Sequence, residues 1–249
     1  MSQTNEPAAW APASAFAGPD AERVDVWRIR LDGEPPLGLL TENERRRADR
    51  LLGADRRRQF ASARASLRVL LGRYLERSPE TVELRLGQNG KPELPHDELS
   101  FNLSHSGDLA LLAVAGAGTA LGIDLEEVST ARPLDRMAQR FFSTREAAQY
   151  ASLPPPERAG AFYRLWTRKE SYLKAWGTGL TFSSRRFTLE LGPGPGRLLS
   201  NTEMPGDDDP RAWWFEDLDA APGFCAALCW RGERACLGLF DFPRAGLVA

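Results

Sequence analysis

The chain has 249 residues, of which 42% are hydrophobic and 27% charged, an ordinary composition for a globular protein with a sizeable core. Its formal net charge of −2 excludes the strong overall field by which proteins capture nucleic acid or anionic membranes. No apolar run approaches the length of about eighteen residues that predicts a membrane helix, so we expect a cytoplasmic protein that binds neither nucleic acid nor membrane.

The first half of the chain predicts a mixture of strands and helices. Residues 24–31 alternate apolar and polar side chains, as a strand does. Thr41 and Glu44 form the pattern of a capping box, which opens a short, arginine-rich helix. An amphipathic helix follows over residues 55–76, and residues 99–115 predict two strands joined by a Ser-Gly-Asp turn.

The second half repeats this order of elements loosely. A strand over residues 121–126 leads to a helix over residues 134–142, and Ser143 begins a second capping box. A proline-rich break precedes a long helix that ends near Trp176, and several strands close the chain. The repetition predicts an α+β fold of two similar lobes, each a small antiparallel sheet packed with a long helix. The lobes would span residues 21–118 and 119–249, behind a loose tail at residues 1–20.

Three acidic side chains are spaced so that they can converge. Asp124 and Glu126 share one face of their strand because side chains alternate along it. The four-residue spacing of Trp166, Glu170 and Lys174 places a ring, a carboxylate and an ammonium on one face of the long helix. Three carboxylates beside a lysine suit a hard divalent cation that holds a phosphate-bearing substrate. The alternative is that these carboxylates are ordinary solvent-facing charges.

Other polar residues suit the binding of phosphate groups. Ser104 and His105 approach a predicted turn, where they could hydrogen-bond a diphosphate or simply satisfy the local backbone. Arg47 and Arg64 belong to a set of arginines that could clamp a terminal phosphate or form a solvated face. Lys91 lies in a Gly-Lys-Pro turn, and only three of the 32 basic residues are lysine, which favours a specific role for each lysine.

Five motifs occur in a fixed order along residues 42–179. They are Gly90-Lys-Pro92, Asn102-Leu-Ser-His-Ser106, Gly122-Ile-Asp-Leu-Glu126, Phe141-Phe142 followed by Glu146, and Trp166-x-x-Lys-Glu-x-x-x-Lys174. Together they resemble the 4′-phosphopantetheinyl transferases, and more narrowly the two-lobed type that activates surfactin synthetase.

The resemblance implies an enzyme, a holo-carrier-protein synthase. With Mg²⁺, it would transfer the 4′-phosphopantetheine arm of coenzyme A to a serine of an apo carrier protein and release adenosine 3′,5′-bisphosphate. The partners would be acyl or peptidyl carrier proteins of polyketide, nonribosomal peptide or fatty-acid synthesis. The fold would be a pseudo-symmetric monomer with coenzyme A in a cleft between the lobes.

The resemblance also assigns roles to residues. Asp124 and Glu170 would bind the metal, and Glu126 would be a third ligand or would hold a bound water. Glu170 would also be the base that takes the proton of the carrier serine, directly or through a water. The other roles are these: Lys174 would steady the transferring phosphate; Lys91, Ser104 and His105 would contact coenzyme A; and Arg47 and Arg64 would hold its 3′-phosphate.

Two alternatives stay open at this level. Glu44 stands where the family often has a lysine, which leaves open which basic pair would hold the 3′-phosphate. A non-catalytic module that binds coenzyme A or a nucleotide would share the cleft. Loss of Asp124, Glu170 or Lys174 would favour such a module, and all three residues are present.

Overall fold

The computed structural model describes residues 9–18, 20, 22–87, 91–177, 182–201 and 209–243. Its α-helices are α1 (Glu42–Asp49), α2 (Ala54–Leu75), α3 (Leu134–Phe141), α4 (Thr144–Ala151) and α5 (Pro155–Trp176). Its strands are β1 (Ala11–Pro12), β2 (Arg23–Arg30), β3 (Arg85–Leu86), β4 (Pro92–Glu93), β5 (Leu99–Ser106), β6 (Leu109–Gly116), β7 (Leu121–Glu127), β8 (Thr188–Leu189), β9 (Leu198–Ser200), β10 (Trp213–Leu218), β11 (Phe224–Arg231) and β12 (Cys236–Phe242).

Both capping boxes predicted from the sequence are present. The Thr41 side chain accepts a hydrogen bond from the backbone of Glu44 at the start of α1, and Ser143 does the same with Glu146 at the start of α4. Gly177 ends α5 with a φ of 81°, a left-handed conformation that favours glycine. Local sequence signals therefore set these helix boundaries.

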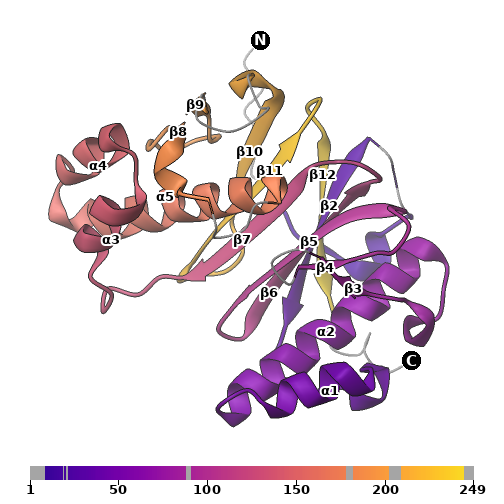
Figure 1. Ribbon diagram of the computed structural model, residues 1–249. Coiled ribbons are helices and arrows are strands. Elements are labelled where there is room, and N and C mark those ends of the chain that lie inside the picture. The colour runs from indigo at the N-terminus through magenta and orange to yellow at the C-terminus, as the bar shows by residue number, and fades with distance from the viewer. Residues whose placement is uncertain are drawn as a thin grey trace.

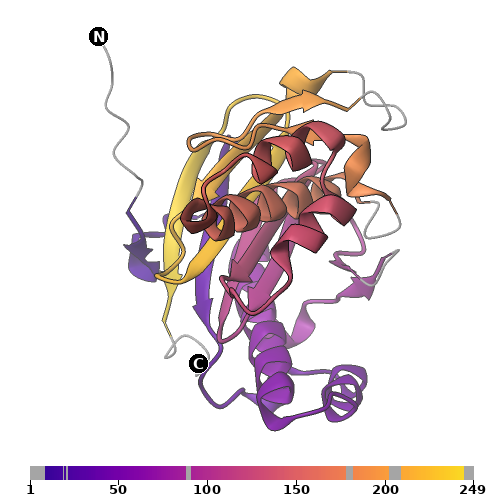
Figure 2. The ribbon, with the colours of Figure 1, turned by 90° about the vertical axis from the view of Figure 1, so that its left-hand side faces the viewer.

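Two sheets make up the centre of the described part of the chain (Figure 1). One has the strand order β1-β12-β2-β6-β5 and the other the order β10-β11-β7, while β3-β4 and β8-β9 form separate short pairs. Figure 2 shows α3, α4 and α5 together over the smaller sheet, with α1 and α2 at the opposite end of the molecule. The architecture is α+β, as predicted.

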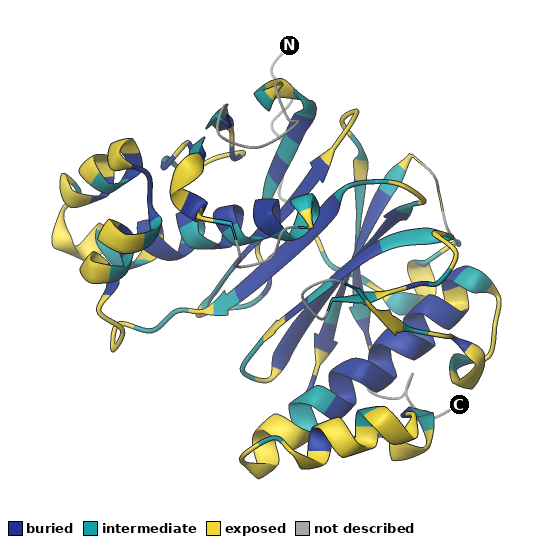
Figure 3. Ribbon diagram, viewed as in Figure 1, coloured by how far each residue is buried: buried dark blue, intermediate teal, exposed yellow. Residues whose placement is uncertain are grey.

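Hydrophobic side chains arrange these elements in layers. Trp27 and Ile29 of β2 pack with α2, which is buried along most of its length (Figure 3), whereas Val26 on the opposite face of β2 packs with Ile123 of β7. The outer face of the smaller sheet packs with α5, for example through Phe162. The order of layers is α2, larger sheet, smaller sheet, α5, and the strands β2 and β6 contribute alternate side chains to two cores.

The first and last described strands, β1 and β12, both join the larger sheet. The strand β12 pairs in parallel with β2, and β1 pairs in parallel with β12. Residues 9–16, which composition places in a loose tail, pack on this sheet through aromatic groups: the Phe16 ring lies 5.2 Å from Trp27 and 5.6 Å from Phe240. Residues 1–8 of that tail lie outside the described residues. The boundary predicted at residue 118 falls between β6 and β7, and β12 crosses back over it.

The sheets meet edge to edge at β5 and β7 through side chains instead of a backbone ladder. Backbone N–H groups of β7 donate to side chains of β5: Ile123 to Asn102 at 2.8 Å, Leu125 to Ser104 at 3.2 Å, and Glu127 to Ser106 at 2.9 Å. These bonds satisfy alternate N–H groups on an edge that backbone pairing leaves open.

No helix in the described ranges is long and apolar enough to cross a membrane.

Candidate active site

The close approach of α5 to β7 builds the centre of the site. A side chain at Gly122 would collide with the carbonyl oxygen of Ser171 on α5, so only glycine permits this contact. The approach places the face of α5 that carries Trp166, Glu170 and Lys174 over the face of β7 that carries the acidic residues. The residue spacing in the sequence predicted both of these faces, the one on α5 and the one on β7.

Lys174 ties several of these groups together. Its Nζ donates to Asp124 Oδ1 at 2.7 Å, to Ser104 Oγ at 2.9 Å and to the carbonyl oxygen of Ile123 at 3.0 Å. Asp124 is buried, and its second oxygen, Oδ2, has no hydrogen-bond partner in the described part of the chain. The ammonium thus neutralises one side of a buried carboxylate and leaves the other oxygen available.

The negative charge of Asp124 acts on both Glu126 and Glu170. Burial and then the charge of Asp124 raise the pKa of Glu170 to about 7, and Lys174 opposes this rise. The same two causes raise the pKa of Glu126, whose carboxylate accepts hydrogen bonds from Trp166 Nε1 at 3.3 Å and Arg132 Nη1 at 3.4 Å. The structure therefore brings the three acidic residues together.

This donor set fits a divalent cation. Among the described residues, no three His, Cys, Asp or Glu side chains enclose a metal position by themselves. Mg²⁺, however, takes only one or two protein carboxylates and completes its shell with water and substrate phosphates. The unpartnered Asp124 Oδ2, together with the raised pKa values of Glu126 and Glu170, marks an excess of buried negative charge that such a cation would relieve.

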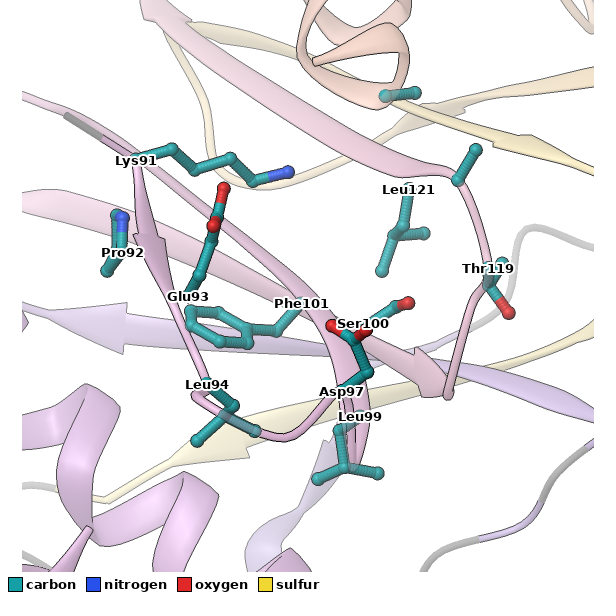
Figure 4. Close-up of a pocket in the computed structure, with 12 residues that line it drawn as sticks. Lys91, Pro92, Glu93, Leu94, Asp97, Leu99, Ser100, Phe101, Thr119 and Leu121 are labelled. Carbon is teal, nitrogen blue, oxygen red and sulfur yellow. The ribbon is translucent and has the colours of Figure 1, made fainter. Parts of the chain in front are cut away.

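Two further nitrogen-bearing side chains lie beside this cluster. Lys91 Nζ lies 3.4 Å from the carbonyl oxygen of Lys174, and burial and the Lys174 charge lower its pKa, against the effect of Glu93. Lys91 lines a cavity of about 150 Å³. In Figure 4 its side chain lies beside Glu93 on one side of this cavity, with Leu121 on the other side. Desolvation and then Lys174 lower the pKa of His105. The ammonium groups of Lys91 and Lys174 give this edge of the site a positive field, and the lowered pKa of His105 favours its neutral form.

Arg47 and Arg64 line a different cavity, of about 620 Å³, between α1, α2 and β3. Their guanidinium carbons lie 5.4 and 5.6 Å from the centre of the Phe60 ring. Arg64 is also paired with Glu44 at 3.4 Å, and Glu44 pairs with Arg68 at 3.1 Å. Burial lowers the pKa of Arg64. Glu44 is therefore the counter-ion of this arginine cluster, a role that its position in the capping box did not reveal.

The opposite side of α5 holds the helix in the core. Lys169 Nζ bonds both oxygens of Glu146 at 2.8 Å and the carbonyl oxygen of Phe187 at 3.0 Å, and both charged side chains are buried. The neighbouring Arg168 bonds both oxygens of Asp217. Sequence reasoning placed Lys169 in a functional motif and Glu146 in a capping box but did not predict that they pair.

Comparison with known proteins places this site in a family. A family model described as the 4′-phosphopantetheinyl transferase superfamily matches residues 120–229, which include β7 and α5. The 4′-phosphopantetheinyl transferase HetI of Nostoc sp. is 40% identical over 170 residues, covering 64% of this chain and 71% of that protein. This chain belongs to the 4′-phosphopantetheinyl transferase superfamily.

Two further relatives of the superfamily span more of the chain. The 4′-phosphopantetheinyl transferase psf-1 of Bacillus pumilus is 33% identical over 195 residues, covering 73% of this chain and 77% of that protein. The 4′-phosphopantetheinyl transferase Sfp of Bacillus subtilis is 28% identical over 204 residues, covering 76% and 87%. The family and the class of enzyme predicted from the motifs are confirmed.

Proposed function

We propose that this phosphopantetheinyl transferase moves the 4′-phosphopantetheine arm of coenzyme A to a serine of an apo acyl or peptidyl carrier protein and releases adenosine 3′,5′-bisphosphate. The observation that carries the proposal is the cluster of Asp124, Glu170 and Lys174 between β7 and α5, inside the region that the family model matches. A buried carboxylate with one unpartnered oxygen, a second acidic group and an ammonium suit transfer of a phosphoryl-linked group.

We also propose that the molecule is built from two similar lobes and acts as a monomer. In each half, the chain runs from a strand through a capped short helix and a long helix to an antiparallel pair. The three strands compared are β2, β5 and β6 in the first half and β7, β10 and β11 in the second. In each half the third of these strands lies between the first and the second, which gives the orders β2-β6-β5 and β7-β11-β10. The lobes would be residues 21–118 and 119–249, with β12 reaching across to β2, and coenzyme A would lie between them.

Asp124, Glu126 and Glu170 would hold Mg²⁺, and the bound cation would offset the negative charge of the coenzyme A diphosphate. Lys174 would steady the transferring phosphate. All three of its ammonium protons are engaged within the protein, so contact with a phosphate requires that it release one acceptor.

Glu170 would accept the proton of the carrier serine. The serine oxygen would then form a bond to the phosphorus that carries pantetheine, and the bond from that phosphorus to the oxygen of the bisphosphate would break. No covalent intermediate on the protein is required, so the protein's contribution is positioning and charge.

Removing the divalent cation is expected to abolish the reaction. We expect an apo carrier protein incubated with coenzyme A, Mg²⁺ and this protein to gain the mass of one phosphopantetheine arm at its serine. Excess EDTA should prevent the gain, and added Mg²⁺ should restore it. Intact-protein mass spectrometry measures the outcome. Binding of coenzyme A without any change in the mass of several apo carriers would instead identify a non-catalytic binding module.

Lys91, His105, Arg47 and Arg64 would bind coenzyme A. Lys91 and His105 lie beside Lys174 at the central cluster, where the diphosphate would lie, with Lys91 supplying charge and His105 a hydrogen bond. Arg47 and Arg64 would hold the 3′-phosphate in the cavity beside Phe60. Arg47 suits this role best because it is exposed, whereas Arg64 is already paired with Glu44.

Arg47→Ala is expected to raise KM for coenzyme A at least about tenfold, because a hydrogen bond to a charged group contributes about 1.5–3 kcal/mol. The same substitution should leave KM for 3′-dephospho-coenzyme A unchanged. Steady-state kinetics with both substrates test this. Arg46→Ala is the matched control, since Arg46 lies on the same helix and pairs with Glu42. An equal effect of Arg47→Ala on both substrates would refute the assignment.

A further inference from the structure

One carboxylate, that of Glu44, contacts two arginines of α2. Its Oε2 accepts hydrogen bonds from Nε and Nη2 of Arg68 at 3.2 and 3.1 Å and from the backbone N–H of Thr41 at 2.9 Å. Its Oε1 lies 3.4 Å from Nε of Arg64. The side chains of Glu44, Arg64 and Arg68 are 14%, 10% and 3% exposed. Two largely buried guanidinium groups therefore share one counter-ion.

The charges around this carboxylate do not cancel. Burial lowers the pKa of Arg64, and the charges of Arg47 and Arg68 lower it further, against the opposing effect of Glu44. These three arginines and one glutamate line the cavity beside Phe60 and carry a formal charge of +2. The other charged side chains of the lining are exposed, so water and salt screen them: Glu80, Glu83 and Arg85. The cavity therefore suits a phosphate monoester, which carries about −1.5 to −2 charges at pH 7.

The charge of Glu44 can be separated from its structural role at the start of α1. A capping box accepts glutamine as well as glutamate at this position, and the carbonyl oxygen of glutamine would still accept a hydrogen bond from Arg68. Arg68 also donates to the carbonyl oxygen of Val82 at 2.5 Å, and Arg64 packs over the Phe60 ring. Glutamine would therefore change the charge of the cavity while these contacts stay in place.

We propose that Glu44 is a specificity-determining residue that weakens the binding of the 3′-phosphate of coenzyme A. Its carboxylate neutralises part of the charge of Arg64 and Arg68 and repels a phosphate bound beside them. The preference for coenzyme A over 3′-dephospho-coenzyme A is therefore smaller than three unopposed arginines would give. The by-product carries the same 3′-phosphate, so Glu44 would also speed its release. This inference rests on the proposed function, which places the 3′-phosphate in this cavity.

Glu44→Gln is expected to raise the affinity for coenzyme A about tenfold, because the phosphate then faces three arginines without a carboxylate beside them. The affinity for adenosine 3′,5′-bisphosphate should rise by a similar factor, and the affinity for 3′-dephospho-coenzyme A should not change. Isothermal titration calorimetry without a carrier protein measures all three. Glu42→Gln is the matched control, since it removes the same charge from the same helix, but Glu42 is exposed and pairs with Arg46.

Glu44→Gln also leaves the buried Arg68 without its counter-ion, which lowers stability. If that variant does not fold, the same substitution is made in Arg68→Met, where no such charge remains. Arg68→Met alone should weaken the binding of coenzyme A about tenfold, because the charge of Glu44 is then less opposed. This loss is expected although all three nitrogens of Arg68 are engaged by Glu44 and Val82. Adding Glu44→Gln should restore the affinity to near the wild-type value.

The proposal is overturned if Glu44→Gln leaves the ratio of the affinities for coenzyme A and 3′-dephospho-coenzyme A unchanged. It is also overturned if Glu44→Gln weakens the binding of coenzyme A, because Glu44 would then act only by holding the arginines in place. Equal affinity of the wild-type protein for the two molecules would instead refute the placement of the 3′-phosphate in this cavity. A protein that modifies no carrier would refute the proposed transfer, a result on which these binding measurements do not depend.

Discussion

Glu170→Gln is expected to lower the rate of carrier modification about 10³-fold, within the range of a lost general base. Glutamine keeps the shape of the side chain but can neither accept the serine proton nor contribute a negative charge to the metal. Single-turnover assays with saturating coenzyme A and Mg²⁺ measure the loss. Asp124→Ala is expected to abolish transfer as well, because it removes the carboxylate that carries the free buried oxygen.

The fold is expected to survive Glu170→Gln. Burial and the charge of Asp124 disfavour the ionised form of Glu170, as its pKa of about 7 shows, so a neutral side chain removes an unfavourable charge. The midpoint of urea unfolding should therefore not fall. Glu157→Gln, on the exposed first turn of the same helix, is the control and should leave the rate unchanged. Near wild-type transfer by Glu170→Gln would remove Glu170 from the proposed site.

The acidic face of the site was predictable because it depends on local periodicity. Alternation along β7 fixes which side Asp124 and Glu126 face, and the helical repeat fixes the side of Glu170 and Lys174. A glycine at position 122 then allows the two faces to meet. Each of these signals lies within a few residues along the chain, where sequence patterns determine structure directly. Whether the three carboxylates bind a metal stays a prediction.

Other features depend on contacts between distant segments, and no local pattern encodes them. Lys174 donates to three acceptors from β5 and β7, and this arrangement depends on the meeting of these strands with α5. Glu44 satisfies its capping box and also pairs with two arginines of α2. The parallel pairing of β12 with β2 joins segments that are far apart in the sequence. The alternation of side chains along β12 would alone fit a place in either sheet.

The largest effect on stability is expected at the buried pair of Lys169 and Glu146. Lys169→Met should lower the free energy of unfolding by about 3–5 kcal/mol, because it leaves a buried carboxylate without its counter-charge. Glu146 is fully buried, and burial lowers the pKa of Lys169 to about 8, against the charge of Glu146. Urea denaturation measures the change. Arg46→Met, which breaks an exposed pair with Glu42, should cost only about 0.5 kcal/mol.

A double variant distinguishes loss of the ion pair from loss of packing. Glu146 also accepts backbone N–H bonds from Ser143 at 2.6 Å and Leu189 at 2.7 Å, and glutamine can keep one of them through its carbonyl oxygen. Lys169→Met combined with Glu146→Gln removes both charges, so it should recover part of the stability lost in Lys169→Met. Equal stability of the single and double variants would show that packing of the lysine stem, and not the unpaired charge, causes the loss. The pair of Lys169 and Glu146 anchors α5, the helix that carries Glu170 and Lys174, but it lies on the side of α5 away from the candidate site. A variant that recovers stability should therefore also recover the rate of transfer.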